Sequence, residues 1–362
     1  MVGKKYKNKI IRCFMLIIKM KILILHLETS KQFMLRLIFL ILISSLSTAV
    51  RVHAQKKVPQ LKAKVDSILD NRYFNSKYDT NYISRPSQRL TLKLRTNLSG
   101  NEITSERRAD GETFRSKIST DNRLTFSVGA SYRGLSASLS LNPASLSGKD
   151  EDFELNVSYY SNKISLDVSY QEAKTLNGDY ESQDQTVHLD KGSISMKMFN
   201  FAGNYTFNHR RFSIPAAFTQ SYIQRRSAGS WLAGMSYQGI EIKNASDELQ
   251  GLPQMRVFIG NFAIGGGYGY NFVVKKWLFH LSAMPTLIIV NRNNITVNGE
   301  RYKTGYHFPE MIFNHRLAIV HNFNERFFFT ATTVINLTTF HSSNYFVVQD
   351  KWKARATFGF RL

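Results

Sequence analysis

The residues that come closest to a catalytic arrangement are His280 and Ser282, which stand on either side of Leu281. A histidine beside a serine can take the proton of the hydroxyl group, and a third polar group that orients the histidine completes such sites in lipid hydrolases. Apolar residues alternate with the pair from Trp277 to Ala283, so both side chains share the polar face of a predicted strand. A lipid-cleaving pair must reach a bilayer, which a polar face turned inward does not. We therefore interpret the pair as ordinary inward-facing residues and predict no catalytic residue.

Metal and cofactor chemistry also find no support in the sequence. His315 and His321 share the mainly apolar face of one predicted strand, at a spacing that makes no plausible metal site. The triple glycine Gly265–Gly267 lies inside a predicted strand rather than in a phosphate-binding loop, so it marks a bend or a close approach of two backbones. The single cysteine, Cys13, lies in the N-terminal segment. We predict no metal and no cofactor.

The most unusual stretch is Arg210–Ser230, with the sequence RRFSIPAAFTQSYIQRRSAGS, which has four arginines, one proline and no acidic residue. We take it as a candidate plug or ligand-binding segment. Its candidate site residues are Arg210, Arg211, Gln220, Gln224, Arg225, Arg226, Ser227 and Ser230. What this segment can do depends on the elements that hold it.

Those elements are predicted to be β-strands. The clearest lies at the C-terminus, where apolar residues from Trp352 to Leu362 alternate with Lys353, Arg355 and Arg361. The same alternation recurs along the chain and predicts twelve strands. Their ranges are 88–98, 123–132, 135–141, 153–160, 163–171, 194–207, 231–243, 257–274, 277–290, 312–323, 326–340 and 352–362.

Two architectures use many alternating antiparallel strands, the soluble β-sandwich and the transmembrane β-barrel. A β-strand needs about nine to eleven residues to cross a bilayer. The predicted strands are near this length, which favours the barrel. Aromatic residues at many strand ends, in a chain with 13% aromatic residues, favour it too. We therefore predict an all-β fold, an antiparallel transmembrane β-barrel of about twelve strands with a short N-terminal periplasmic helix.

Loop lengths support the same interpretation, because bacterial barrels have short periplasmic turns and longer outer loops. Short connections near Arg133, Ser161, Lys275 and Asn324 alternate with longer ones. The exception is Arg210–Ser230, which falls on the periplasmic side by count and yet is long.

The N-terminal region is typical of a secretion signal. From Met34 the chain has a basic residue at Arg36, a short apolar run to Leu46 and a small-residue cleavage site that ends at Ala54. An anchor helix is the alternative. Residues 1–33 are either the product of a start codon upstream of the natural one or a long leading region.

These signals predict three parts. We expect a signal peptide over 1–54, a periplasmic segment over 55–87 with a short helix at 57–70, and a barrel over 88–362. Cleavage after Ala54 removes ten Lys or Arg and one Glu, which lowers the formal net charge from +22 to +13.

Three blocks of the chain resemble one family. They are YDTNYI at Tyr78–Ile83, the block from Arg210 to Trp231, and GGGYGYNFVVKKWLFHLSAMP at Gly265–Pro285. They are similar to an uncharacterised bacterial family, domain of unknown function 4421, over most of residues 60–362. The resemblance implies an outer-membrane β-barrel of Gram-negative bacteria, and it implies no activity and no catalytic residue.

Charge is the remaining indication of function. Basic residues predominate on the predicted inner faces over the acids Asp152, Glu154 and Asp167. The basic residues are Arg89, Lys93, Arg95, Arg123, Lys163, Lys197, Arg316, Lys353, Arg355 and Arg361. This excess either attracts anions or pairs with acids to fill the lumen. Nucleic acid is not an expected partner, because the basic residues alternate along strands and form no single patch.

We therefore expect a non-enzymatic outer-membrane protein, either a structural component or a small channel. Its surroundings are outer-membrane lipid, and its expected partner is an anionic small ligand or a cell-envelope component. The alternative is an envelope enzyme that acts on lipid or glycan. The apolar residues of Arg210–Ser230 need cover and Pro215 cannot join a strand ladder, so we predict that this segment folds into the barrel as a plug. Its arginines would then pair inside. A disordered basic periplasmic loop is the alternative.

Overall fold

The computed structural model describes residues 77–362 apart from 89, 110–111, 133–134, 144–151, 182–185, 245–253, 304–307 and 343–344. The expected signal peptide at 1–54 and the expected helix at 57–70 lie outside the described residues. The chain divides into the units Met1–Phe74 and Asn75–Leu362, and all described elements belong to the second. Within the described part of the chain, no helix has the length and apolarity needed to cross a membrane.

The second unit is almost entirely antiparallel β-sheet, as the alternation predicts. Its strands are β1 (Ile83–Ser84), β2 (Leu90–Ala109), β3 (Glu112–Ser119), β4 (Arg123–Tyr132), β5 (Leu135–Leu141), β6 (Phe153–Tyr160), β7 (Ile164–Glu181), β8 (Thr186–Thr206), β9 (Ile223–Gln224), β10 (Ala228–Asn244), β11 (Met255–Val274), β12 (Trp277–Asn291), β13 (Asn294–Val297), β14 (Glu300–Lys303), β15 (Met311–Asn322), β16 (Phe327–Ser342) and β17 (Tyr345–Arg361). One short helix, α5 (Ile214–Phe218), lies between β8 and β9. Each predicted strand range falls on a strand of this set, and β1, β3, β9, β13 and β14 are additional.

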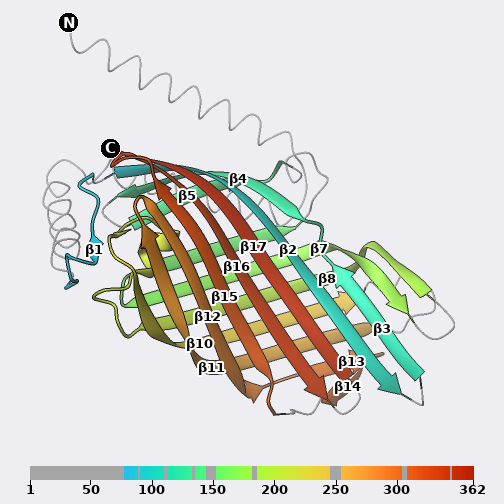
Figure 1. Cartoon of the computed structure of the whole chain (residues 1–362). Coiled ribbons are helices and arrows are strands. Elements are labelled where there is room, and N and C mark those ends of the chain that lie inside the picture. The colour runs from blue at the N-terminus through green and yellow to red at the C-terminus, as the bar shows by residue number, and fades with distance from the viewer. Residues whose placement is uncertain are drawn as a thin grey trace, which may run out of the picture. The chain divides into compact units, whose positions relative to one another are not determined.

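Strand pairing closes the sheet on itself. From β10 the order runs through β8, β7, β3, β2, β17, β16, β15, β12 and β11, and β11 pairs again with β10. In Figure 1, β2, β17, β16, β15 and β12 run across β7, β8, β10 and β11 behind them. Closure pairs the backbone groups of the ring strands with one another, which a sheet that crosses a bilayer requires.

Different strands form the ring at different heights. The segment of β2 from Glu102 onward pairs with β3, which also pairs with β7, whereas the first half of β2 pairs with β4. Next to these, β4 pairs with β5 and β6 pairs with β7. Among the described residues no pair joins β5 to β6, so the count of twelve strands around the ring stays a prediction. The tight turns at 275–276 and 323–326 share one end with the C-terminal Leu362, and this is the periplasmic end.

A belt of exposed apolar side chains surrounds the periplasmic part of the ring. On the paired strands β2, β4 and β17, the neighbours Leu94, Val128 and Phe358 are 61%, 63% and 46% exposed. The adjacent inward-facing side chains Lys93 and Thr357 are buried. An apolar exterior around a polar interior is the reverse of a soluble protein and is the pattern of a lipid-facing barrel wall. The chain is therefore an outer-membrane β-barrel.

Beyond the belt, towards the outer end, the pattern reverses. On β8, Phe199 is exposed within the belt, but farther out Ile194 and Met196 face inward and are buried, while Lys197 faces outward. The Lys197 ammonium lies 3.5 Å from the Glu172 carboxylate on the outer surface. The expectation that Lys197 lines the lumen is wrong, because strands that rise above the lipid meet water on their outer face.

These inward apolar residues form a buried cluster in the outer half of the ring. The cluster, here called the apolar layer, draws residues from β2, β7, β8, β10, β11, β12, β15 and β17. Its buried members are Ile103, Ala173, Leu176, Leu189, Ile194, Met196, Met198, Ile240, Ala263, Ile288, Ile312 and Val347. Since strands from all sides of the ring contribute, the layer crosses the lumen.

Lipid exposure of the belt predicts a position-dependent cost of charge. Leu94→Arg places a cation in the belt and is expected to destabilise the folded barrel by about 2–4 kcal/mol. Thr104→Arg, on the same face of β2 but beyond the belt, is the matched control and is expected to cost about 0–1 kcal/mol. Urea unfolding in lipid vesicles, followed by the gel shift between heated and unheated samples, measures both. Equal costs at the two positions would contradict the assignment of the belt.

Candidate functional site in the barrel lumen

The segment Arg210–Ser230 contains the helix α5, which its sequence favours despite its short length. Ser213 caps the N-terminus, and its Oγ accepts a hydrogen bond from the backbone N–H of Ala216 at 3.2 Å. Pro215 occupies the first turn, where its missing N–H costs nothing. The chain leaves the helix through Gln220, whose φ of 54° lies in the left-handed region.

The helix α5 lies inside the ring. It contacts β12, β15 and β16, and Ile214, Ala216 and Ala217 are almost fully buried. From the other side of the ring, the Lys93 ammonium on β2 donates to the carbonyl oxygen of Thr219 at 2.6 Å. The Tyr160 ring on β6 stacks against Phe218 with centroids 6.2 Å apart. One helix that touches strands on opposite sides of a closed ring must occupy its lumen.

Gln224 holds both ends of this segment through hydrogen bonds. Its side-chain Oε1 accepts hydrogen bonds from the Ser213 backbone N–H and from Asn271 Nδ2, both at 3.0 Å. Its Nε2 donates to the carbonyl oxygens of Arg211 and Arg226. The backbone of Gln224 also pairs with Ile83 in the small sheet formed by β1 and β9. A buried amide that satisfies this many partners pins both ends of the segment.

The structure separates the candidate site residues into two groups. Gln220, Gln224 and Ser230 are buried, and Ser227 Oγ accepts from the Val273 backbone N–H at 2.9 Å. The arginines Arg210, Arg211, Arg225 and Arg226 are exposed instead. Arg211 lies 3.3 Å from the Asp79 carboxylate near the surface. The expected pairing of the arginines inside the lumen is therefore not made, because the apolar residues between them occupy that space and leave the charges in water.

Beneath α5 lies an arrangement with the form of a catalytic triad. His280 Nε2 is 3.0 Å from Ser282 Oγ, and His280 Nδ1 is 2.7 Å from Asn271 Oδ1. Asn271 Nδ2 donates to the Ser213 carbonyl oxygen at 2.9 Å, so its Oδ1 is the atom that faces the imidazole. His280 Nδ1 must then carry the proton, which leaves Nε2 free to accept the hydroxyl proton of Ser282.

The same three residues are covered by side chains of the segment Arg210–Ser230. Phe212 stacks on the His280 ring with centroids 5.8 Å apart, and Phe218 meets it edge-on at 5.2 Å. Asn271, His280 and Ser282 are each less than 5% exposed. The third member, Asn271, was missed in the sequence, although the turn at Lys275–Lys276 sets it opposite His280 in the register.

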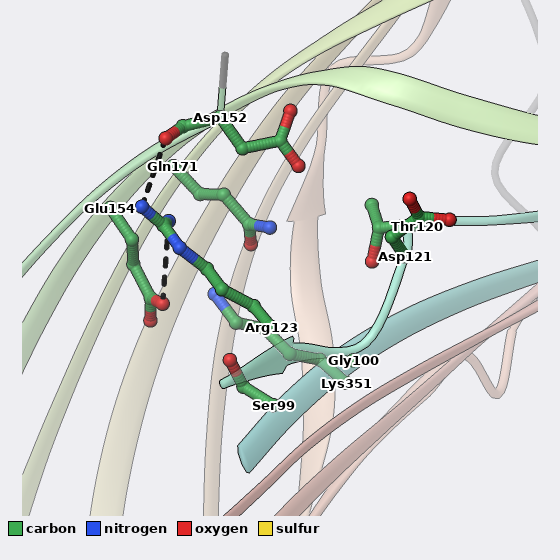
Figure 2. Close-up of a pocket in the computed structure, with 9 residues that line it drawn as sticks. All are labelled: Ser99, Gly100, Thr120, Asp121, Arg123, Asp152, Glu154, Gln171 and Lys351. Carbon is green, nitrogen blue, oxygen red and sulfur yellow. Dashed lines mark hydrogen bonds and ion pairs between the residues drawn. The ribbon is translucent and has the colours of Figure 1, made fainter. Parts of the chain in front are cut away.

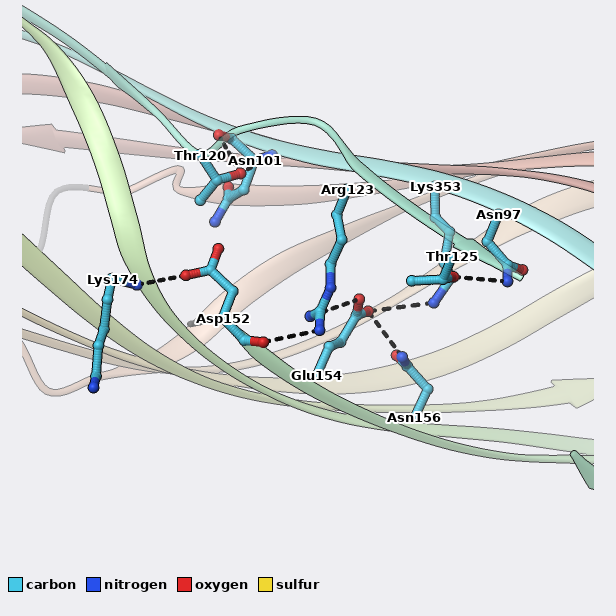
Figure 3. Close-up of polar contacts among 10 residues, drawn as sticks. All are labelled: Asn97, Asn101, Thr120, Arg123, Thr125, Asp152, Glu154, Asn156, Lys174 and Lys353. Carbon is cyan, nitrogen blue, oxygen red and sulfur yellow. Dashed lines mark hydrogen bonds and ion pairs between the residues drawn. The ribbon is translucent and has the colours of Figure 1, made fainter. Parts of the chain in front are cut away.

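A charged layer lies between α5 and the apolar layer. Near α5, the Arg316 guanidinium on β15 donates to the Asp167 carboxylate at 2.7 Å, and the Tyr160 hydroxyl donates to the same carboxylate at 2.6 Å. Farther out, Glu154 on β6 lies 3.3 Å from the Lys353 ammonium and 4.0 Å from Arg123. Figure 3 shows Glu154 between these two cations and Asn156.

Among the residues that the structure describes, basic side chains outnumber acidic ones in this layer. The acids that face it are Asp152, Glu154 and Asp167. The inward-facing basic residues of this layer are Lys93, Arg95, Arg123, Arg316, Lys351, Lys353 and Arg355. Arg361, also expected in the lumen, is buried at the periplasmic end, where it donates to Asn322 Oδ1 and to the Glu325 carbonyl oxygen. Lys163, likewise expected in the lumen, is exposed in the turn after β6, where its ammonium lies over the Tyr205 ring. Arg89 lies outside the described residues.

A pocket opens in the charged layer where β2, β4, β6, β7 and β17 approach one another. It is a small pocket that is partly open to solvent. Figure 2 shows Arg123, Glu154 and Lys351 reaching into the same space, with Gln171 beside them. The Arg123 guanidinium donates to the Asp152 carbonyl oxygen at 2.9 Å. Above the pocket, Gln238 donates to Gln349 at 3.0 Å in an amide bridge across the lumen.

His315, His321, Gly265 and Gly267 belong to strands of the barrel wall. His315 stacks on Phe313, and the His321 ring lies tilted against the Trp277 ring with centroids 4.2 Å apart. Among the described residues no group of acidic, histidine or cysteine side chains could hold a metal ion. At Gly265 and Gly267 a Cβ atom would lie 2.3 Å from the Pro285 carbonyl oxygen and 2.1 Å from that of Ala283. The expected close backbone approach is confirmed.

The comparisons with known proteins bear on the whole barrel. A family model described as "Domain of unknown function (DUF4421)" matches residues 77–362. No curated protein matches the chain.

Solved structures similar to this chain are outer-membrane proteins. The outer membrane protease OmpT from Escherichia coli shares 6% identity, with 76% of this chain and 97% of that one covered and a TM-score of 0.41. The translocator domain of the autotransporter NalP from Neisseria meningitidis shares 9%, with 87% and 98% covered and a TM-score of 0.29. OprG from Pseudomonas aeruginosa shares 10%, with 76% and 97% covered and a TM-score of 0.28. At such scores these similarities carry no argument about function.

The hydrogen bonds of Gln224 predict where the folded barrel resists protease. Trypsin added from the periplasmic side is expected to leave the wild-type barrel uncut at Arg225 and Arg226, because β9 and Gln224 fix the backbone there. Gln224→Ala removes a buried amide, at a cost of about 1–3 kcal/mol, and is expected to speed this cleavage about tenfold or more. Gln254→Ala, at an exposed glutamine near the outer end, is the control. Rapid cleavage of the wild-type barrel at Arg225 would mean that the segment is not docked.

Proposed function

The chain belongs to the DUF4421 family, and we propose that it serves in the outer membrane as a closed, non-enzymatic barrel, a structural or ligand-holding component rather than an open channel. The observation that supports this proposal is a lumen obstructed twice, by α5 at the periplasmic end and by the apolar layer at the outer end. Either obstruction alone would interrupt a continuous water path.

The two obstructions differ in kind. The plug is held by directional bonds, chiefly those of Gln224 and Asn271, and is therefore a discrete element that one substitution can loosen. The apolar layer belongs to the ring strands themselves, so it moves only if the wall moves. Burying its side chains contributes about 1.5–3 kcal/mol for each large one, which favours a wall that stays shut.

This proposal predicts electrical silence. Folded wild-type protein in a planar bilayer is expected to give no conductance steps. Gln224→Ala is also expected to be silent, because the apolar layer remains when α5 is loosened. A recording without conductance supports the closed barrel only if the gel shift on heating shows that the inserted protein is folded. Steady conductance of wild-type protein, with or without a preference for anions, would favour the small channel instead.

A second candidate is an envelope hydrolase that acts on lipid or glycan, and it is favoured by the geometry of Ser282, His280 and Asn271. His280 can accept the proton of the Ser282 hydroxyl group, and Asn271 orients His280. These two relations define an activated serine. Substrate would require α5 to move, since Phe212 and Phe218 cover the histidine. Under the first candidate, the same network anchors the plug.

An alkyl fluorophosphonate, which labels activated serines covalently, separates the two candidates. The hydrolase predicts no labelling of the wild-type protein, labelling of Gln224→Ala, and loss of that labelling when Ser282→Ala is added. The non-enzymatic barrel predicts that none of the three is labelled. Tryptic cleavage at Arg225 shows independently whether α5 has been loosened in the variant.

A further inference from the structure

The pocket in the charged layer holds a cation that the protein does not satisfy. The Lys351 ammonium on β17 is buried and makes no hydrogen bond in the structure. The Oε1 atom of Gln171, which lines the same pocket, is also buried without a partner. A buried ammonium has three donors, and leaving them unpaired in a membrane-enclosed lumen costs far more than leaving a neutral group unpaired.

The described acids that line the pocket already have partners. Glu154 forms ion pairs with Lys353 and Arg123, and it also accepts a hydrogen bond from Asn156 at 2.8 Å. The Asp121 carboxylate binds the Lys191 ammonium on the outer side. The Asp152 carboxylate accepts from the Lys174 backbone N–H at 2.7 Å. Among the described residues of the charged layer, basic side chains outnumber acidic ones, and this excess favours a negatively charged ligand.

We propose that this pocket is a binding site for a small oxyanion of the phosphate type, held by Lys351 with Arg123 and Gln171. Phosphate oxygens accept the donors of Lys351, and the O–H group of a hydrogen phosphate donates to Gln171 Oε1. A lysine and an arginine that converge on one space, as in Figure 2, suit this ligand. The site is independent of whether the barrel conducts or hydrolyses.

The phosphate group has two sources, a free ion or a lipid headgroup. Gln171 is followed by Glu172, which forms with Lys197 an outward ion pair just beyond the belt. The pocket therefore lies at the height of the outer edge of the belt, where lipid headgroups begin. Both sources present the same chemistry to Lys351, and the experiment distinguishes them.

The test is titration calorimetry with the full barrel in an uncharged, phosphate-free detergent. Inorganic phosphate is expected to bind saturably, and Lys351→Met is expected to weaken binding about tenfold or more, because it removes the charge-assisted hydrogen bonds. Lys351→Arg retains the charge and should keep most of the affinity. Lys117→Met, at an outward lysine whose side chain is 66% exposed, is the matched control and should leave binding unchanged.

A soluble phosphatidic acid with six-carbon chains is the second probe. Tighter binding than that of inorganic phosphate, with the same loss in Lys351→Met, assigns the pocket to a headgroup. Equal or weaker binding assigns it to the free ion. If neither probe binds saturably to folded protein, or if Lys351→Met binds as well as the wild type, the proposal is overturned.

Thermal unfolding shows whether Lys351→Met loses phosphate binding only because it is poorly folded. Without phosphate, Lys351→Met is expected to be at least as stable as the wild type, since it removes an unpaired buried charge. With phosphate, the wild type should gain stability and the variant should gain little. A variant that is less stable in both buffers would show that Lys351 serves Glu154 rather than a ligand, and would contradict the proposal.

Discussion

Closure of the ring through β10 and β11 is the constraint on which the rest of this structure depends. Once the sheet is closed, alternate side chains of the ring strands must point into one enclosed space, and that space has to be filled or solvated. The chain fills it in layers. Apolar side chains close the outer end, an amide bridge and a charged layer lie below, and the helix α5 closes the periplasmic end. The pocket in the charged layer lies where Lys351 is left without a hydrogen bond.

Alternation in the sequence predicted the strands well, because the lipid-facing belt imposes one period of two on every strand. It failed where the surroundings change while the period does not. Lys197 keeps the alternation of β8 but lies above the belt, where the apolar face turns inward and the charged face turns to water. The alternation of apolar and polar residues does not by itself show which face of a strand meets water. The position of the residue relative to the bilayer is needed as well.

The plug segment shows a different limit. Its apolar core and Pro215 indicated that it needs cover, and the structure gives that cover inside the ring. The exposed arginines were misjudged because a short helix flanked by turns can leave its ends at the surface while its middle is buried. The partnership of Asn271 with His280 was within reach of the sequence, since a two-residue turn fixes which residues face each other. The lack of a hydrogen bond at Lys351 could not be predicted from the sequence, because it depends on how Glu154 is placed among its three neighbours Lys353, Arg123 and Asn156.

The central claim is that α5 occupies the lumen, and thiol accessibility tests it most directly. In a chain with Cys13→Ser, a cysteine is placed at Ala217, which is fully buried, or at Arg226, which is exposed. The account predicts that a membrane-impermeant maleimide reacts with Arg226→Cys in the folded barrel and leaves Ala217→Cys unmodified until the barrel is unfolded. Equal rates of modification at the two positions in the folded protein would contradict it.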